Sequence, residues 1–179
     1  METKTQKQLV EQACLGDVGS FGKLYEHYYA TMVWLAYSIV KDVTTAEDIA
    51  QQSFATACEN LGSLKDKEKF ANWLSGICRN TALTSFAQSK KDNVSIDDVV
   101  LVCNDEGNDV EEQKIVQKSV FELPQMYREV VVLHYYNDMS YDQIRDLLGV
   151  SLHTVRGRLR RARKKIEKYL KKQNFENEV

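Results

Sequence analysis

The sequence predicts an all-α protein made of two small helical domains joined by a flexible acidic linker. Apolar side chains recur at helical spacing along almost the whole chain, and no strand–turn–strand pattern appears. Helical spacing is lost only over residues 92–112, where Asn, Asp and Gly accumulate as they do in linkers. The expected boundaries are therefore 1–91 for the first domain, 92–112 for the linker, 113–172 for the second domain and 173–179 for a tail.

The first domain is expected to consist of helices. Aromatic and aliphatic residues trace one face of a long helix over residues 21–39. Thr44 and Glu47 have the spacing of a capping box, which predicts that a helix starts there, and Gly62 is expected to end it. A third helix is expected from about Phe70 to Phe86, because its apolar residues again recur at helical spacing.

The second domain is expected to begin with a helix near Glu112 and to continue with another after Pro124, the only proline. A proline suits the first turn of a helix, because the N–H that it lacks would have no partner there. Residues 130–133 (VVVL) would form a strand by propensity alone. We expect a helix of about a dozen residues instead, because the proline before it and the helical pattern after it agree.

Residues 140–163 have the pattern of a helix-turn-helix. Ser140 and Gln143 form a capping box at the first helix, Gly149 ends that helix, and Ser151 is placed to cap the second. One face of the second helix is apolar and the opposite face is cationic, which is typical of a recognition helix that faces DNA. The apolar stripe is Val155, Leu159 and Ala162, and the other side carries His153, Arg156, Gly157, Arg160, Arg161 and Lys164.

Charge is strongly segregated although the formal net charge is only −2. Residues 140–172 hold eleven Lys and Arg against three Asp and Glu, whereas residues 92–112 hold eight acids and no basic residue. The first 91 residues are balanced, with ten of each sign. The sequence pI of about 6.0 would argue against a nucleic-acid partner, but the basic segment indicates one.

Several classes of protein are disfavoured by the composition. No apolar run approaches the ~18 residues of a membrane span, and the first residues lack a secretory signal, so we expect a cytoplasmic protein. The four cysteines show no C-x-x-C pair, which favours reduced thiols over disulfides or zinc ligands. The glycines form no phosphate-binding loop and the three histidines have no nucleophile or metal partner nearby, so we expect no enzyme, metal or cofactor.

The succession of segments resembles the extracytoplasmic-function (ECF) group of bacterial sigma factors. An aromatic-rich first helix is followed by AEDIAQQSF (46–54), FANWLSGICRNTAL (70–83), LPQMYREVVVLHY (123–135) and the helix-turn-helix. The resemblance covers about residues 8–91 and 113–170. It implies sigma domains two and four, binding to core RNA polymerase, recognition of promoter DNA at two elements and help in opening the duplex. It also implies a monomer when free, and leaves open an anti-sigma factor as a further partner.

In the first domain the resemblance implies roles for five residues. Asp48 and Gln51 lie in the helix with which the family binds core polymerase. The less favoured alternative is that Asp48 merely stabilises a helix N-terminus through the dipole. Trp73 and Asn80 match the segment that handles the start-proximal promoter element, and aromatic and amide groups suit the holding of opened strands. Trp73 could equally be part of the core. Lys65 lies in the loop with which the family grips a flipped base.

In the second domain the resemblance places residues of the second helix on the distal promoter element. Arg156, Gly157, Arg160 and Arg161 would face base edges. Thr154, Arg158 and Arg163 would face phosphates, and His153 would lie at the DNA-facing start of the helix.

Three departures from the family pattern affect this interpretation. Arg145 stands where a small alanine is usual, so its stem must turn outward or the crossing of the two helices must shift. Gly157 stands where serine is common, which costs roughly 1 kcal/mol of helix stability. Residues 84–91 are less basic than the family typically shows, which predicts weak contact with upstream duplex.

Two other functions remain open at this point. A stand-alone helix-turn-helix regulator would usually dimerise on a palindrome, and no heptad seam is visible for that. A sigma-like adaptor would bind polymerase without opening promoters, and the departures at Arg145 and Gly157 keep it possible.

Overall fold

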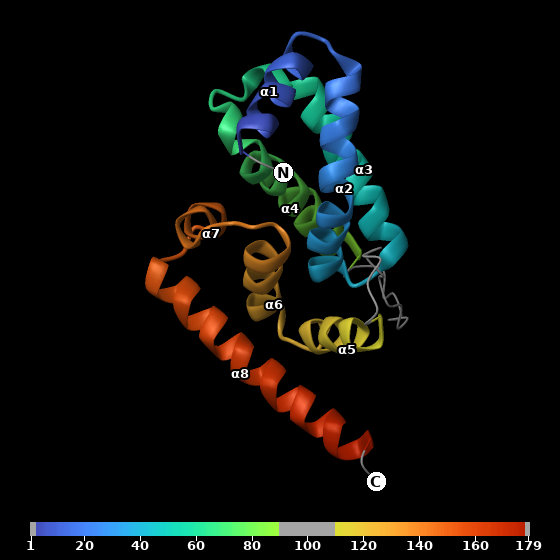
Figure 1. Ribbon diagram of the computed structural model, residues 1–179, viewed down its shortest axis with the longest axis vertical. Coiled ribbons are helices and arrows are strands. Elements are labelled where there is room, and N and C mark those ends of the chain that lie inside the picture. The colour runs from blue at the N-terminus through green and yellow to red at the C-terminus, as the bar shows by residue number, and fades with distance from the viewer. Residues whose placement is uncertain (1–2, 90–109, 178–179) are drawn as a thin grey trace. The chain divides into compact units, whose positions relative to one another are not determined.

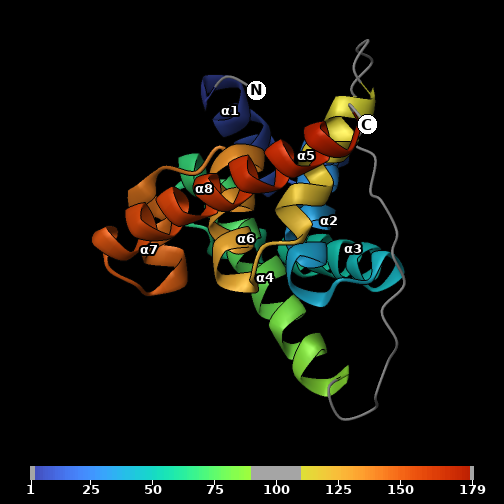
Figure 2. The ribbon, with the colours of Figure 1, turned by 90° about the horizontal axis from the view of Figure 1, so that it is seen from below.

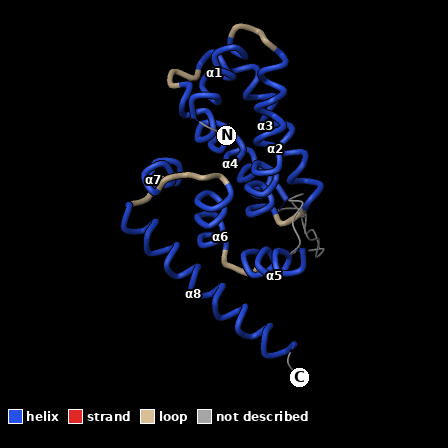
Figure 3. Tube along the Cα trace, in the orientation of Figure 1, coloured by secondary structure: helices blue, strands red, loops and turns tan. Residues whose placement is uncertain are grey.

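The computed structural model describes residues 3–89 and 110–177, with side chains described over residues 5–89 and 114–173. Within these ranges all regular structure is helical (Figure 3), which confirms the all-α prediction. The chain divides into two compact units, Met1–Asp97 (unit 1) and Asp98–Val179 (unit 2). The predicted linker lies outside the described residues except for 110–112, which begin a helix.

Unit 1 is built around its second helix. Helices α1, α3 and α4 all pack against α2, and α3 and α4 also pack against each other (Figures 1 and 2). Short 3-10 turns at Leu61–Ser63 and Lys67–Lys69 flank the loop between α3 and α4. The four helices are α1 (Thr3–Cys14), α2 (Val18–Val40), α3 (Val43–Asn60) and α4 (Phe70–Ser89).

The core of unit 1 centres on the second half of α2. Every residue from Met32 to Ile39 is buried, so this stretch is enclosed on all sides rather than on the single face expected from the sequence. Trp34 and Leu35 are among its largest fully buried side chains. Phe70, the first residue of α4, is also fully buried. Burial of such side chains is the main force that holds the helices together.

Two features of unit 1 differ from the prediction. Helix α1 was not expected, and it packs through Leu9 and Val10. The predicted capping box at Thr44 and Glu47 is wrong, because α3 begins at Val43 and the carboxylate of Asp42 accepts the N–H of Thr45 at 2.7 Å. Charge makes a carboxylate a strong cap, since it also faces the positive end of the helix dipole.

Unit 2 is built along one long helix. Helices α5 (Val110–Phe121), α6 (Gln125–Val131) and α7 (Tyr141–Leu148) each pack against α8 (Leu152–Asn177). In Figures 1 and 2, α7 lies at the N-terminal end of α8, and α5 lies beside its C-terminal half. Helix α8 therefore extends through residues 173–177, which were expected to form a tail.

The segment after Pro124 is helical, as predicted. Pro124 is the N-cap of α6, and the VVVL segment continues from α6 into a wider π-helical turn, Val132–Tyr136. Buried Arg128 holds the preceding loop, because its Nη2 and Nε donate to the carbonyl of Leu123 at 3.0 and 3.3 Å. Paired donation from a guanidinium satisfies a buried carbonyl that would otherwise be costly.

Candidate nucleic-acid interface

The helix-turn-helix forms as the sequence predicts. Ser140 Oγ accepts the N–H of Gln143 at 3.3 Å, and the Gln143 side chain accepts the N–H of Ser140 at 2.6 Å. Gly149 ends α7 in the left-handed region, with φ +64°, which glycine adopts without a Cβ clash. Ser151 Oγ then accepts the N–H of Thr154 at 3.1 Å and caps α8.

Helix α8 presents opposite faces to the core and to solvent. Val155, Leu159 and Ala162 are at most 2% exposed. Arg156, Arg160 and Arg161 are exposed, and within the described part of the chain no carboxylate pairs with them. His153 and Lys164 are exposed too. A row of unpaired guanidinium groups can form bidentate hydrogen bonds with guanine edges or phosphates.

The remaining candidates of α8 lie at the margins of this face. Thr154 and Arg158 are half-buried, and the Thr154 hydroxyl shares a 2.9 Å hydrogen bond with Ser151. Gly157 has open space around it, because a Cβ built there would meet nothing within 4 Å. Arg163 is exposed but anchored, since its Nε donates to the Tyr135 hydroxyl at 2.7 Å.

The side chain of Arg145 turns outward, which is one of the two arrangements that the sequence analysis allowed. It is half-buried, and its guanidinium pairs with Asp142 at 2.6 Å and Asp146 at 2.8 Å on its own helix. The hydrogen bond that Arg145 donates to Asp146, together with the charge of that carboxylate, raises the pKa of Arg145. Its charge is therefore matched within α7.

In unit 1 the candidates lie on α3, on α4 and in the loop between them. Asp48 and Gln51 are exposed, while Ile49 and Phe54 carry the buried face of α3. Asp48 of α3 and Asn80 of α4 both line a groove of about 580 Å³. Its lining is rich in hydroxyl and amide groups and consists of Thr45, Asp48, Ile49, Gln52, Asn80, Thr81, Thr84, Ser85 and Gln88.

Trp73 and Asn80 lie seven residues apart on α4, so they share one strip of the helix. Asn80 is exposed, and Trp73 is half-buried with its ring 6.2 Å from that of Phe70. Trp73 therefore packs in part and keeps part of its surface exposed, which is compatible with both interpretations of this residue. Aromatic and amide groups on one strip suit contact with exposed bases.

The loop before α4 leaves one of its three lysines disengaged. Lys67 Nζ donates to the carbonyl of Leu64 at 2.6 Å, and Lys69 pairs with Asp66 at 3.5 Å. Lys65 is exposed and has no ion pair within the described residues. Lys65 is thus the loop cation best able to meet a phosphate.

Helix α1 contacts the loop before α4 through polar side chains. The Gln6 side chain accepts a 2.9 Å hydrogen bond from the Tyr28 hydroxyl, and Lys7 pairs with Glu68 at 3.1 Å. The Glu68 partner raises the pKa of Lys7. Helix α1 thereby ties the loop that carries Lys65 to α2.

Comparison with known proteins assigns each unit to a family model. Residues 24–92 match the model described as Sigma-70 region 2, and residues 114–166 match the model described as Sigma-70, region 4. The chain is 28% identical to the ECF RNA polymerase sigma factor SigW of Bacillus subtilis, over 92% of this chain and 96% of that protein. It is 29% identical to the RNA polymerase sigma-H factor of Pseudomonas aeruginosa, over 92% and 93%.

The protein belongs to the ECF group of the sigma-70 family. A solved structure, the sigma factor RpoE with the anti-sigma factor NepR from Bartonella quintana, has the same fold. It has a TM-score of 0.72 and 22% identity, and it covers 86% of this chain and 98% of that one. Sigma factors of this family initiate transcription, and the predicted family and function are confirmed.

Some features of this sigma factor could not be found from its sequence. The groove between α3 and α4 and the Tyr135–Arg163 contact depend on how helices pack, so the spacing of residues in the sequence does not predict them.

Two further sequence predictions concern lysines and cysteines. Lys90 and Lys91, part of the weakly basic end of domain two, lie outside the described residues. Cys14, Cys58 and Cys78 are free thiols, and burial raises the pKa of Cys78 to about 12.

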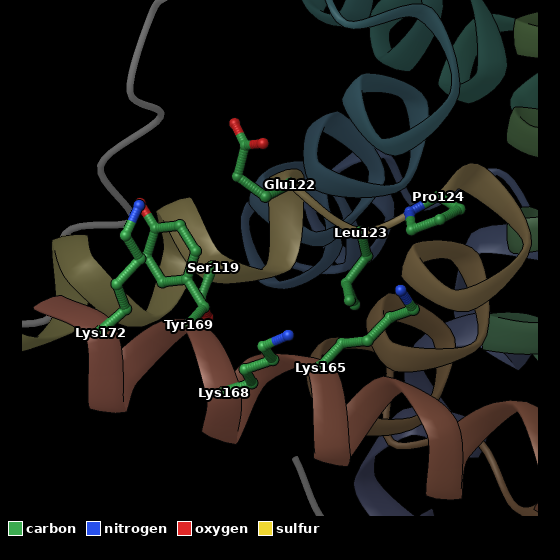
Figure 4. A pocket seen from close by; sticks show the side chains of 8 residues that line it. All are labelled: Ser119, Glu122, Leu123, Pro124, Lys165, Lys168, Tyr169 and Lys172. Carbon is green, nitrogen blue, oxygen red and sulfur yellow. The ribbon is translucent and has the colours of Figure 1, made fainter.

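Unit 2 also contains a pocket of about 370 Å³ between the end of α5 and the C-terminal half of α8 (Figure 4). Lys165, Lys168 and Lys172 reach over it from α8, and Leu123 lies opposite them (Figure 4). Neither a membrane-spanning helix nor a cluster of three potential metal ligands is found in the described ranges.

Proposed function

We propose that this sigma factor binds core RNA polymerase through α3 and directs it to promoters that it reads with α4 and α8. One observation carries the proposal above all. The region 4 match falls on unit 2, where α8 exposes Arg156, Arg160 and Arg161, and no acidic partner for them is found among the described residues. The region 2 match falls on the other unit, where Asp48 and Gln51 are exposed.

The distal promoter element would be read by the cationic face of α8. Arg160 and Arg161 would form bidentate hydrogen bonds with guanines, each worth ~1–3 kcal/mol of discrimination. Arg156 would reach the next base edge, and the open space at Gly157 would let the duplex approach closely. Arg158 and Thr154 would contact phosphates at the margins, and His153 would lie at the start of the interface.

The start-proximal element would be held by the α4 strip and its loop. Trp73 offers a half-exposed ring on which an unpaired base can stack, and such stacking contributes ~1–3 kcal/mol. Asn80 would hydrogen-bond a base edge, and Lys65 would attract the phosphate beside it. These groups suit single-stranded DNA, which agrees with a role in opening the duplex.

Core polymerase would contact Asp48 and Gln51. Asp48 and Asn80 line the same groove, so the polymerase surface and the promoter surface of unit 1 would share it. Polar contacts there would set the register of the partner. We propose an anti-sigma factor as a further partner, by analogy with the RpoE–NepR complex.

We also propose that the protein is a monomer when free, works in the cytoplasm and catalyses no reaction of its own. The match to region 2 disfavours a stand-alone regulator, which would need only the helix-turn-helix. A sigma-like adaptor would bind polymerase but give no specific transcripts.

Transcription with bacterial core polymerase on a library of genomic fragments tests the proposal. Specific transcripts should appear only when the protein is added.

Variants of α3 test the contact with polymerase. Asp48→Ala and Gln51→Ala should weaken association with core polymerase without lowering the melting temperature, because both side chains are exposed. Glu26→Ala, at an exposed carboxylate of α2, is the control. Binding to core without specific transcripts would favour the adaptor, and a dimeric footprint without polymerase would favour the regulator.

A further inference from the structure

The contact between Tyr135 and Arg163 joins two elements that are far apart in the sequence. Arg163 lies on α8, and Tyr135 lies in the π-helical turn that follows α6. Arg163 Nε donates to the Tyr135 hydroxyl at 2.7 Å, and its Cζ lies 5.7 Å from the centre of the Tyr135 ring. The hydrogen bond that Arg163 donates to Tyr135 is the main cause of the raised pKa of Arg163.

The π-helical turn holds Tyr135 in a fixed place. The N–H of Asn137 donates to the carbonyl of Val132 at 3.1 Å, five residues back, which widens the turn. His134 packs between two rings, with its own ring 4.7 Å from Tyr135 and 4.9 Å from Tyr141. Its Nδ1 lies 2.9 Å from the carbonyl of Met139, so the imidazole is anchored as well. Tyr135 is nevertheless 49% exposed.

Arg163 belongs to the same strip of α8 as two residues of the cationic face. Arg156, Arg160 and Arg163 follow one another at four and three residues, so their side chains leave the helix on one side. All three are exposed. Tyr135 therefore stands at the end of this row and contacts its last guanidinium.

A guanidinium has five N–H donors in a rigid plane. Tyr135 takes the Nε donor, and the Tyr141 hydroxyl contributes a weaker interaction. Arg163 is exposed, so the Nη donors that the two tyrosines leave free can form a bidentate pair with two phosphate oxygens. A free arginine loses rotamer freedom when it binds, whereas one that is already anchored loses less.

We infer that Tyr135 is a positioning residue that orients Arg163 to clamp one phosphate of the promoter backbone. This inference rests on the proposed function, because it requires that α8 faces DNA. The clamp carries no sequence information, so it fixes how α8 lies on the duplex while Arg160 and Arg161 choose the bases.

Binding of the full-length protein with core polymerase to promoter duplex, measured over a series of salt concentrations, tests the inference. Tyr135→Phe keeps the ring and removes the hydroxyl, so affinity should fall about 2- to 10-fold for specific and random duplex alike. Its salt dependence should hardly change, because the cation remains. Arg163→Ala should make the slope of log K against log salt shallower by ~0.9. Tyr127→Phe, whose hydroxyl has no hydrogen bond within the described residues, is the matched control.

The double variant separates positioning from a merely structural brace. Tyr135→Phe should cost nothing further when Arg163 is already alanine. An equal loss in both backgrounds, or an unchanged slope for Arg163→Ala, overturns the inference. Arg163→Lys keeps the charge but lacks the Nε donor, so it should resemble Tyr135→Phe. If Arg160→Ala and Arg161→Ala also leave binding unchanged, the proposed function fails; if they impair binding while Tyr135→Phe does not, only this inference fails.

Discussion

The two units are both helical, but they differ in how their candidate functional residues and their charges are distributed. In unit 1 the candidate residues are spread over α3, α4 and a loop, and packing of α3 against α4 places Asp48 and Asn80 on the same groove. In unit 2 most of them lie on α8 alone, where Arg156, Arg160 and Arg161 follow from helical spacing. The charge differs in the same way, since residues 140–172 carry eleven basic and three acidic side chains, whereas residues 1–91 are balanced.

This difference predicts two kinds of DNA contact. Dense positive charge on one helix gives affinity that falls steeply with salt, because each neutralised phosphate releases counterions. A half-exposed tryptophan and an amide give contacts that depend on base stacking and hydrogen bonding, and therefore little on salt. Removal of Asn80 and removal of Arg158 should thus be distinguishable by salt dependence alone.

The largest effect is expected when one core is damaged and the other is left intact. Leu159→Ala in unit 2 and Leu35→Ala in unit 1 each remove a side chain that is at most 2% exposed. Such changes destabilise a domain by about 2–5 kcal/mol. Leu159→Ala should unfold unit 2 and abolish duplex binding while unit 1 stays folded, as resolved by amide NMR spectra of the full chain. Loss of both units from either substitution would contradict their independence.

The next effect separates arginines of α8 that would contact bases from those that would contact phosphates. Arg161→Ala should cost ~1–3 kcal/mol of preference for the promoter over random duplex, because a bidentate pair with guanine is lost. Arg158→Ala, at the margin, should weaken binding to both duplexes alike and reduce the salt slope by ~0.9. Competition binding at several salt concentrations measures both. Identical profiles for the two variants would remove the distinction between base and phosphate contacts.

The fold and the helix-turn-helix could be predicted from the sequence because their signals are local. The capping box of Ser140, the glycine at 149 and the cap at Ser151 all depend on residues three or four positions apart. The face of α8 follows from the same geometry. Local rules were therefore sufficient for most of unit 2.

The features that the sequence did not predict depend on tertiary packing. Helix α1 has few apolar residues. Besides the buried Leu9 and Val10, it contacts the rest of unit 1 through Gln6 on Tyr28 and Lys7 on Glu68, which lie far along the chain. The contact between Tyr135 and Arg163 needs the π-helical turn, which no spacing rule reports. The wrong capping box on α3 shows that a local rule also fails where a better cap stands two residues earlier.

A smaller effect tests how much stability unit 2 loses at two glycines of its helix-turn-helix. Gly157→Ala should stabilise unit 2 by about 1 kcal/mol, because alanine favours a helix interior and a Cβ there meets nothing within 4 Å. Gly149→Ala should destabilise it by about 1–2 kcal/mol, because its φ is +64°. Thermal unfolding of the two variants gives the comparison. A shift of the same sign in both would show that backbone conformation does not control stability at these positions.

The smallest expected effect concerns the acidic residues between the units. Residues 92–109, whose structure lies outside the described ranges, carry six Asp and Glu and no basic residue, and they precede a segment with the opposite charge. We expect the acids to screen the arginines of α8 weakly, because the Debye length at physiological salt is only ~8 Å. Replacing the six acids by their amides should raise affinity for duplex DNA at low salt, by less than about tenfold, and should leave it unchanged at high salt. A rearranged segment of the same composition is the control and should bind like the parent, since only charge is involved. Equal low-salt affinities of the amide variant and the parent would show that the acids do not screen α8.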